Sequence, residues 1–356
     1  MKFVEIEKMG SAVSNMMLSR RIAYVDGTQN PKAGDLVVVK ALSESTTYGN
    51  LELPSGRLAK INTGDILLGV LGKRRALKGF VGDVPETVSA GDRLHLLNMG
   101  GVIGLCKGHH SSFSDAIEVE VIGVGCDEAE KILNIGDNAL KPVLNLNPSA
   151  PIVVIAGTCM NSGKTVAATE IIKQAANAGL RVAGAKMSGI ACLRDTLHMQ
   201  DHGAIATASF VDCGLPSTVD YGDLAPIAKA ILNHLNRFEP ELIVVELGDG
   251  IVGGYSVDSV LMDHEIRNAI SSFVFCASDY VGVIGGRSVL DGLGIDVDVV
   301  AGSVTDSQMG EDFITQNFGV QAGNARRNGK RLFDLISLKL NGLASGVKTS
   351  EAVVTA

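Results

Sequence analysis

Residues 151–166 are Pro-Ile-Val-Val-Ile-Ala-Gly-Thr-Cys-Met-Asn-Ser-Gly-Lys-Thr-Val, and this stretch decides the fold of the second half of the chain. The apolar run 152–156 predicts a buried strand, 157–165 a loop, and the apolar residues that follow recur at helical spacing. A strand, a glycine-bounded loop and a helix opening with Gly-Lys-Thr are what a phosphate-binding P-loop requires. In such a loop, backbone N–H groups wrap the phosphate and the helix N-terminus adds about half a positive charge.

The spacing within the loop suggests a role for each residue. Residues 158–162 separate Gly157 from Gly163, which is one residue more than in the commonest P-loop. Lys164 is expected to act catalytically on the outer phosphates, and the Thr165 hydroxyl to hold Mg²⁺. A chance Gly-Lys-Thr is the competing interpretation. The predicted nucleotide-binding residues here are Gly157, Thr158, Asn161, Ser162, Gly163, Lys164, Thr165 and Val166.

Composition limits the classes of protein that the chain can belong to. Its 356 residues are 46% hydrophobic and 20% charged, which predicts a folded protein large enough for two domains. A net charge of −8 argues against nucleic-acid and acidic-membrane partners. The six scattered cysteines and the absence of a signal peptide or a long apolar run predict a cytoplasmic protein.

The two halves of the chain differ in pattern. Residues 1–145 contain short β-rich runs between Gly-Asp turns, which predict a small barrel or sandwich domain, with a helix near 11–22. The proline-rich segment 141–151 is the candidate linker. Residues 146–356 alternate apolar strands with helices, among them a helix over 257–271. The predicted fold class is therefore α/β: a parallel P-loop NTPase sheet flanked by helices, preceded by the β-rich domain.

A second motif, Glu-Leu-Ile-Val-Val-Glu-Leu-Gly-Asp-Gly, occupies residues 241–250. A buried strand that ends in an acid and enters a glycine turn is typical of a Walker B element, which delivers a carboxylate to Mg²⁺ or its water. Glu246 is thus predicted to be a catalytic metal ligand, and Asp249 to share this role or to contact substrate. An acid that only caps the next turn is the competing interpretation.

These motifs together resemble those of the dethiobiotin synthetase-like family, in the SIMIBI class of P-loop proteins, over residues 151–320. The segment Ala-Gly-Ala-Lys-Met-Ser-Gly at 183–189 is similar to a Lys-Pro-x-x-Ser-Gly strand end of that family, although the proline is missing. The resemblance implies that Lys186 is catalytic and holds substrate and phosphate. It also implies substrate contacts from Ser188, Gly189, Gly248 and Asp249.

The resemblance leaves the nucleotide base open. Where the family has an asparagine that recognises adenine, this chain has Gly-Ser-Val-Thr-Asp at 302–306. Thr305 or Asp306 is expected to bond the base edge, and an aspartate there would suit the N1 and N2 donors of guanine. The expected cofactors are Mg²⁺ and ATP or GTP.

Acids, cysteines and histidines gather between residues 192 and 213. The resemblance implies that an aspartate of this region joins the magnesium shell, with Asp195 and Asp201 as candidates. A soft metal site is a further hypothesis, and a polar loop with incidental histidines competes with it. The residues of that hypothetical site are Cys192, His198, His202 and Cys213.

A basic cluster lies in the β-rich half. It is either a solvated face or a binding patch for an anionic ligand, or for the outer phosphates of the nucleotide, across the domain interface. Its members are Arg57, Lys60, Lys73, Arg74, Arg75 and Lys78.

Two functions fit these observations. The first is an ATP-dependent enzyme, a ligase or kinase, that activates or phosphorylates a small carboxylate-type metabolite through positioning and charge stabilisation. The second is an ATP- or GTP-hydrolysing switch or metallochaperone in cofactor assembly. A small-molecule substrate and a homodimer are expected. A purely structural nucleotide, with function in the β-rich domain, is the third possibility.

Overall fold

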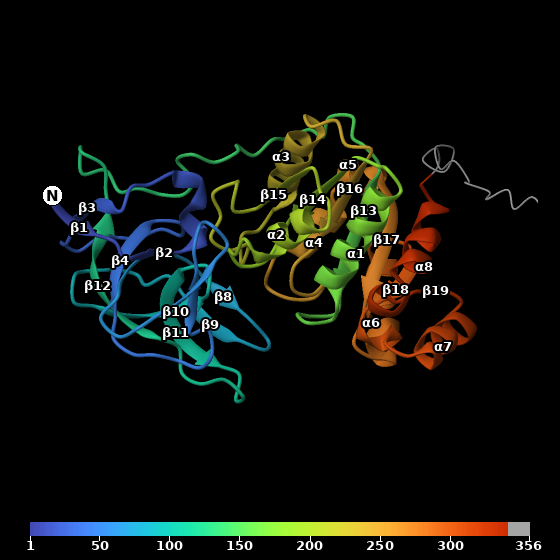
Figure 1. Ribbon diagram of the computed structural model, residues 1–356, viewed down its shortest axis with the longest axis horizontal. Coiled ribbons are helices and arrows are strands. Elements are labelled where there is room, and N and C mark those ends of the chain that lie inside the picture. Colours follow the sequence, from blue (N-terminus) through green and yellow to red (C-terminus); the bar gives the residue numbers. More distant parts are fainter. Residues whose placement is uncertain (341–356) are drawn as a thin grey trace, which may run out of the picture.

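The computed structural model describes residues 1–340 and contains two large β-sheets that lie side by side (Figure 1). A mainly antiparallel sheet of ten strands comes from residues 2–125, and a sheet of seven strands from residues 152–322. The predicted P-loop α/β fold with a preceding β-rich part is therefore confirmed. No helix in the described part of the chain is long and apolar enough to cross a membrane. The domain limits 1–145 and 146–356 stay a prediction, and the second range extends past the described residues.

The first sheet closes on itself as a small barrel. β12 pairs with β4, β4 with β7, β7 with β11, β11 with β10, and β10 again with β12. These strands are β4 Leu36–Ala41, β7 Ile66–Leu71, β10 Arg93–Asn98, β11 Val102–His109 and β12 Glu118–Gly125. Alternate residues fill the interior, as the period of two in a strand requires. They include Val37, Val39, Leu67, Leu71, Leu96, Ile103, Val119 and Val121.

Shorter strands extend this ring at its margins. They are β1 Lys2–Glu5, β2 Lys8–Met9, β3 Arg21–Val25, β8 Arg74–Arg75 and β9 Phe80–Asp83, with a separate hairpin of β5 Asn50–Glu52 and β6 Leu58–Lys60. β8 pairs with β9, which pairs with the far half of β11. The chain next to β8 faces the second sheet.

The second sheet is parallel throughout, in the order β15-β14-β16-β13-β17-β18-β19. Its strands are β13 Ile152–Gly157, β14 Val182–Lys186, β15 Ala206–Ser209, β16 Leu242–Glu246, β17 Ile270–Cys276, β18 Val299–Ala301 and β19 Gln321–Ala322. Strand β13, which leads into the Gly-Lys-Thr loop, lies beside β16, which ends at Glu246. Because the strands run parallel, their carboxyl ends meet at one edge, where ligands of such sheets bind.

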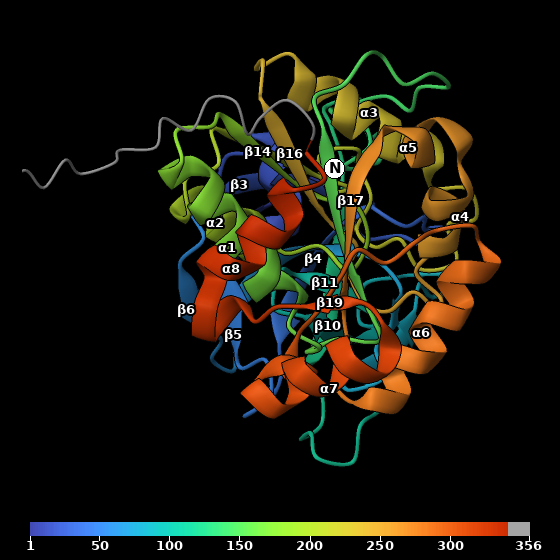
Figure 2. The ribbon, with the colours of Figure 1, turned by 90° about the vertical axis from the view of Figure 1, so that its right-hand side faces the viewer.

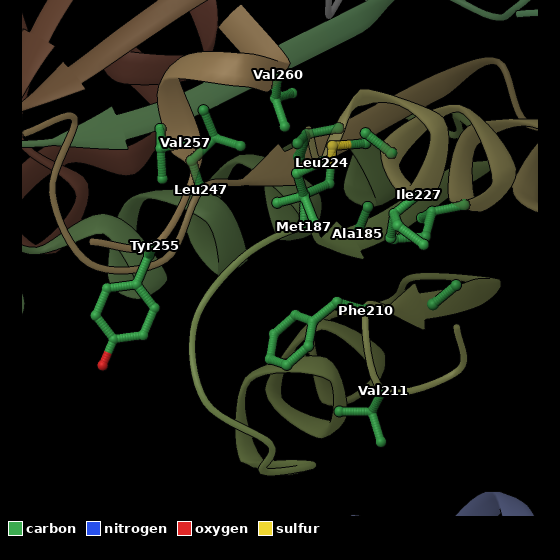
Figure 3. Close-up of a cluster of buried hydrophobic side chains, with 14 of the residues drawn as sticks. Ala185, Met187, Phe210, Val211, Leu224, Ile227, Leu247, Tyr255, Val257 and Val260 are labelled. Carbon is green, nitrogen blue, oxygen red and sulfur yellow. The ribbon is translucent and has the colours of Figure 1, made fainter. Parts of the chain in front are cut away.

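Helices cover both faces of this sheet, as Figure 2 shows. One face carries α1 Lys164–Asn177, α2 Arg194–Asp201 and α8 Ala325–Ser337. The other face carries α3 Ala225–Asn236, α4 Val257–Met262, α5 His264–Ala269 and α6 Tyr280–Gly292. Helix α7, Gln308–Phe318, lies beyond α6. Figure 3 shows part of the core on the second face, where α3 and α4 pack on the sheet. The strands are buried on both sides, which explains their continuous apolar runs.

Two predicted helices differ from the structure. The helix expected over 11–22 is a short 3₁₀ turn, Ser11–Met16, which ends because Met17 has a left-handed φ of 48°. The helix expected over 257–271 is two helices, because the extended backbone of Asp263 (ψ 124°) interrupts it. The Asp263 carboxylate then accepts from the Ile266 N–H and caps the second helix. Strand β17 begins at Ile270, inside the predicted helix.

Polar contacts join the barrel to the parallel sheet. The Asn98 amide donates to the Ala191 carbonyl oxygen at 2.9 Å. The buried Glu52 carboxylate accepts from the Leu193 N–H at 2.7 Å, at the start of α2, where the helix dipole favours an anion. Gly72 approaches Pro216 so closely that a Cβ on it would lie 3.2 Å from the proline ring. The barrel is thus held against the edge of the sheet where the strands end.

Candidate functional site

The loop between β13 and α1 has the backbone of a phosphate cradle. Asn161 and Gly163 have left-handed φ values of 64° and 101°, which turn the chain back towards the helix axis. A Cβ on Gly163 would lie 2.9 Å from the Cα of Gly302, and one on Gly157 would lie 2.6 Å from the Cys276 carbonyl oxygen. Neither position accommodates a side chain, so the loop needs glycine at both. The N–H groups at the start of α1 are left to bind an anion.

Lys164 is folded into this loop. Its ammonium group donates to the Cys159 carbonyl oxygen at 2.7 Å, and the residue is 5% exposed. Burial lowers the pKa of Lys164, and nearby Glu246 only partly opposes this. A buried ammonium whose partner is one carbonyl oxygen gains strongly from an incoming phosphate, which supplies the missing negative charge.

Glu246 lies at the end of β16, beside the start of α1. One carboxylate oxygen accepts from the Thr165 hydroxyl at 2.9 Å and from the Lys186 ammonium group at 2.6 Å. The other oxygen is buried without a hydrogen-bond partner. A hydroxyl and a carboxylate with an unused oxygen are ligands that Mg²⁺ accepts, so the residues present fit a magnesium ion. The structure therefore brings together two of the four predicted metal ligands, Thr165 and Glu246.

Lys186 connects Glu246 to a third charged residue. Its ammonium group also contacts the Asp195 carboxylate, at 2.7 Å, which adds an acid from α2 to the site. Burial opposes the charged form of Lys186, but the two carboxylates outweigh it and raise the pKa of the lysine. Burial likewise opposes ionisation of Asp195, yet Lys186 lowers the pKa of that carboxyl below its usual range. Lys186 and Asp195 are therefore both charged at neutral pH.

Asp249 follows the Walker B strand with a left-handed φ of 63°. Burial raises the pKa of its carboxyl, whereas the positive charges of Lys164 and Arg74 work in the opposite direction. The preceding Gly248 is compulsory, because a Cβ there would lie 2.1 Å from the Ser188 carbonyl oxygen. Gly189 lines the same cavity as Gly248 and Asp249, so three of the four predicted substrate-contact residues face it.

Other predicted site residues lie elsewhere. Ser188 is fully buried and its hydroxyl donates to the Gly248 carbonyl oxygen, so it positions the turn and does not line the cavity. Thr305 is also fully buried, and its hydroxyl donates to the Gly302 carbonyl oxygen at 2.7 Å. Asp201 is exposed at the end of α2, away from the cavity. These residues support the fold near the site and are not placed to bind a base, substrate or metal ion.

The hypothetical soft metal site does not assemble. The Cys192 thiol donates to Glu52 at 3.2 Å, and the His202 ring contacts the backbone oxygen of His198 at 2.7 Å. Within residues 1–340, no group of three or more His, Cys, Asp and Glu side chains is placed to hold a metal ion. His198 lies on α2 and His202 directly follows the helix, but Cys192 and Cys213 do not join them in a metal site.

A cavity of about 390 Å³ lies above the P-loop, between the barrel and the parallel sheet. Lys164, Thr165, Lys186 and Glu246 line it from the sheet side. Residues that the sequence did not assign to the site complete the lining, among them Tyr48, Arg74, Asn98, Arg194, Tyr255 and Arg326. Of these, Arg74 belongs to the basic cluster noted in the sequence. That cluster was the sequence feature that could have identified Arg74 as a site residue.

Two further cavities adjoin the P-loop. One, of about 120 Å³, lies beyond Gly163 and Val166 and is lined by Ser303, Asp306 and Asn324. The exposed Asp306 accepts from the Asn324 amide at 2.9 Å, so the predicted base-binding aspartate does lie next to the loop. The other, of about 640 Å³, opens on the far side of Thr158 and Cys159. Asp249 lines both this cavity and the 390 Å³ one.

The fold and the loop geometry define a P-loop nucleotide-binding protein. No protein-family model and no curated protein matches the chain in sequence. Similar solved structures include chloroplast FtsY from Physcomitrella patens, with 12% identity and a TM-score of 0.38 over 55% of this chain and 67% of that one. The signal recognition particle 54 kDa protein from Aeropyrum pernix K1, in complex with GDP, aligns with 19% identity and a TM-score of 0.36 over 55% of this chain and 49% of its own.

A duf1611 family protein from Anabaena variabilis aligns with 12% identity and a TM-score of 0.40, over 56% of this chain and 63% of its own. At these identities and TM-scores the similarity says nothing about substrate or activity. The narrower resemblance to dethiobiotin synthetase-like proteins of the SIMIBI class stays a prediction.

Proposed function

We propose that the protein binds a magnesium nucleoside triphosphate at the P-loop and transfers its terminal phosphoryl group to a small anionic acceptor in the 390 Å³ cavity. The observation that carries this proposal is that Lys164, Thr165 and Glu246 line the same cavity as Arg74, a cationic side chain of the β-rich part. A cavity walled by both parts of the protein can hold an acceptor next to the outer phosphate and keep water away.

Each residue of the site has a part in this transfer. The loop N–H groups and Lys164 hold the β- and γ-phosphates, and Lys164 exchanges its Cys159 carbonyl for a phosphate oxygen. Thr165 and Glu246 would hold Mg²⁺, which supplies charge neutralisation of the phosphates. An acceptor oxygen forms a bond to the γ-phosphorus while the bond from that phosphorus to the bridging oxygen breaks, and the nucleoside diphosphate leaves with the electron pair. Lys186 stabilises the charge that develops on the transferred group.

Guanine is the base that we propose. Asp306 is an exposed carboxylate in the 120 Å³ cavity beside Gly163, and one of its oxygens is engaged by Asn324. A carboxylate accepts from adjacent N–H groups, which guanine offers at N1 and N2, whereas adenine presents an acceptor at N1. GTP is therefore expected to bind more tightly than ATP.

The experiment that tests the proposal is calorimetric titration of Mg-GTP and Mg-ATP into the wild type and Lys164→Ala. We expect tight binding of GTP and at least a 100-fold loss of affinity in the variant, because the lysine and phosphate form charge-assisted hydrogen bonds. Addition of candidate carboxylic acids should then accelerate nucleotide consumption. Absence of binding of either nucleotide to the wild type would overturn the proposal.

A nucleotide-dependent switch is the second candidate, and one contact favours it. A Cβ on Gly282, near the start of α6, would lie 3.1 Å from the Thr158 methyl group, so the P-loop touches this helix. Large apolar side chains are exposed on α6 and α7, including Val281 at 76% and Met309 at 71%. Such a surface suits contact with a second copy of the chain. A switch would hydrolyse nucleotide slowly whatever metabolite is added, and would change oligomeric state between diphosphate and triphosphate.

A further inference from the structure

Arg74 is a buried positive charge without a carboxylate partner. It lies on β8 and is 2% exposed. One terminal nitrogen donates to the Leu97 carbonyl oxygen and the other to the Tyr48 hydroxyl at 2.8 Å. No carboxylate of the described residues lies within ion-pair distance of it. Arginine is rarely buried unless it is paired with an anion, because a buried unpaired charge is destabilising.

Its two neighbours in the sequence differ from it. Lys73 contacts the Asp220 carboxylate at 3.5 Å, and Arg75 contacts Asp83 at 2.5 Å. Both neighbours also remain partly exposed. Because side chains alternate along a strand, Arg74 points away from these acids and into the space between β8 and the 390 Å³ cavity that it lines. The arginine without a carboxylate is therefore the one that faces the cavity.

The Arg74 side chain still has donors to offer. Its Nε–H is buried and has no hydrogen-bond partner. Two phenols line the same cavity: Tyr48, whose oxygen accepts from Arg74, and Tyr255, whose oxygen accepts from the Arg75 N–H at 3.3 Å. Each phenol keeps its own hydrogen to donate. Burial raises the pKa of Tyr255 to about 12, so it stays a donor at neutral pH.

Asp249 lines the same cavity as Arg74 and Lys164. Its carboxyl is in the electrostatic field of both Lys164 and Arg74. An acceptor that is bound to Arg74 would therefore approach the P-loop across Asp249, whose carboxylate can take a proton from an attacking hydroxyl.

We propose that Arg74, with the hydroxyls of Tyr48 and Tyr255, forms an anion-binding subsite that recognises the acceptor through a carboxylate or phosphate group. The inference rests on the proposed function, since it names the chemical group by which the barrel holds that acceptor. A guanidinium with phenolic donors matches an anionic oxygen group, and the cavity volume restricts the acceptor to a small molecule.

The test uses two probes, succinate and inorganic phosphate, titrated calorimetrically into full-length protein saturated with Mg²⁺ and a non-hydrolysable GTP analogue. The nucleotide fills the P-loop, so that a further anion reports the second subsite. We expect one probe to bind the wild type. The affinity for that probe should fall at least 10-fold in Arg74→Met and by a smaller factor in Arg74→Lys. Tighter binding of succinate assigns a carboxylate, and tighter binding of phosphate assigns a phosphate group.

Lys73→Met is the matched control, because it removes a cation one residue away that has its own acid. It should leave the affinity for the probe within twofold of the wild type. Tyr255→Phe is the second test variant, for use where Arg74→Met does not fold. It should lower the affinity for the probe about fivefold, because one hydrogen bond is lost. Affinity for the nucleotide analogue should change less than twofold in every variant.

Equal affinity of the probe for the wild type, Arg74→Met and Tyr255→Phe would overturn the inference, as would failure of both probes to bind the wild type. A loss of nucleotide affinity in Arg74→Met as large as the loss for the probe would also overturn it, because Arg74 would then serve the nucleotide. If the wild type binds no nucleotide, the proposed function is wrong. Titrations of the probe without nucleotide then still test the anion-binding subsite, because they compare the affinity of the wild type with that of Arg74→Met.

Discussion

The two walls of the 390 Å³ cavity treat their positive charges differently. On the wall formed by the parallel sheet, Lys186 lies between Asp195 and Glu246, at 2.7 and 2.6 Å. On the barrel wall, Arg74 has a carbonyl and a hydroxyl oxygen as partners and no carboxylate among the described residues. Lys186 therefore has carboxylate partners before any ligand arrives, whereas Arg74 has none among the described residues. On binding a ligand, Lys186 would have to exchange a partner, whereas Arg74 would gain one.

The largest expected effect compares the two cations directly. Lys186→Met leaves two neighbouring carboxylates without their counter-charge, and we expect it to lower the free energy of unfolding by about 3–5 kcal/mol. Arg74→Met leaves no charge behind, and we expect a loss of about 1–2 kcal/mol from its two hydrogen bonds. Urea denaturation at pH 7 measures both. The double variant Lys186→Met/Asp195→Asn should recover part of the first loss. Equal losses in the two single variants would contradict the contrast between the walls.

The second prediction concerns the unused oxygen of Glu246. Glu246→Gln removes the negative charge that Mg²⁺ requires, so Mg-dependent nucleotide turnover should fall about 10²–10³-fold. Steady-state assays across a magnesium titration measure this. Glu241→Gln, at the opposite end of the same apolar run, is the control and should keep normal turnover. An unchanged magnesium dependence in Glu246→Gln would remove this residue from the metal site.

A smaller effect is expected at the base end, away from both walls. Asp306→Asn replaces an acceptor oxygen by a donor, so the affinity for GTP should fall about 10-fold and the affinity for ATP should not fall. Competition titrations of the two nucleotides provide the measurement. Asp312→Asn, on the exposed side of α7, serves as the control. Equal changes for GTP and ATP would show that Asp306 does not recognise the base.

The smallest effect concerns Asp249, which lies between the walls. Burial raises the pKa of Asp249 in the folded protein. Its ionised form therefore destabilises the protein above that raised pKa, by about 1.4 kcal/mol for each unit by which the folded pKa exceeds the unfolded pKa. Below the unfolded pKa of about 3.9 both states are protonated and the penalty disappears. Asp249→Asn, which tolerates the left-handed backbone, should therefore stabilise the protein at pH 7, and the gain should vanish as the pH falls towards 4. Denaturation curves across this range, with Asp291→Asn as the control, test the sign.

The meeting of Thr165 and Glu246 on the sheet wall could be expected from the sequence, because each residue belongs to one continuous motif. The P-loop is one continuous stretch, and Glu246 ends a single apolar run, so local pattern and parallel topology together place Thr165 and Glu246 at one edge. The expectation that Thr305 bonds the edge of the nucleotide base does not fit its position in the structure, and the reason is local. Thr305 follows strand β18, but its hydroxyl turns inward to the Gly302 carbonyl oxygen.

The barrel wall could not be predicted to the same degree. The basic cluster contains six residues, and the sequence does not indicate which of them is buried. In the structure Arg57, Lys60 and Lys78 are exposed, whereas Arg74 is buried against Tyr48 and the Leu97 carbonyl oxygen, which are far from it in the sequence. Strand β15, Ala206–Ser209, was missed because its short run of small and polar residues lacks an apolar pattern.

The closed ring of β4, β7, β11, β10 and β12 has a consequence for how this protein can diversify. The interior of the ring is filled by side chains of its own strands, whereas Arg74 lies outside the ring on β8, whose described strand partner is β9. Changes in the segment around β8 therefore leave the barrel interior intact. Under the proposed function, a different acceptor would therefore require changes in only a few residues at this margin and none in the P-loop.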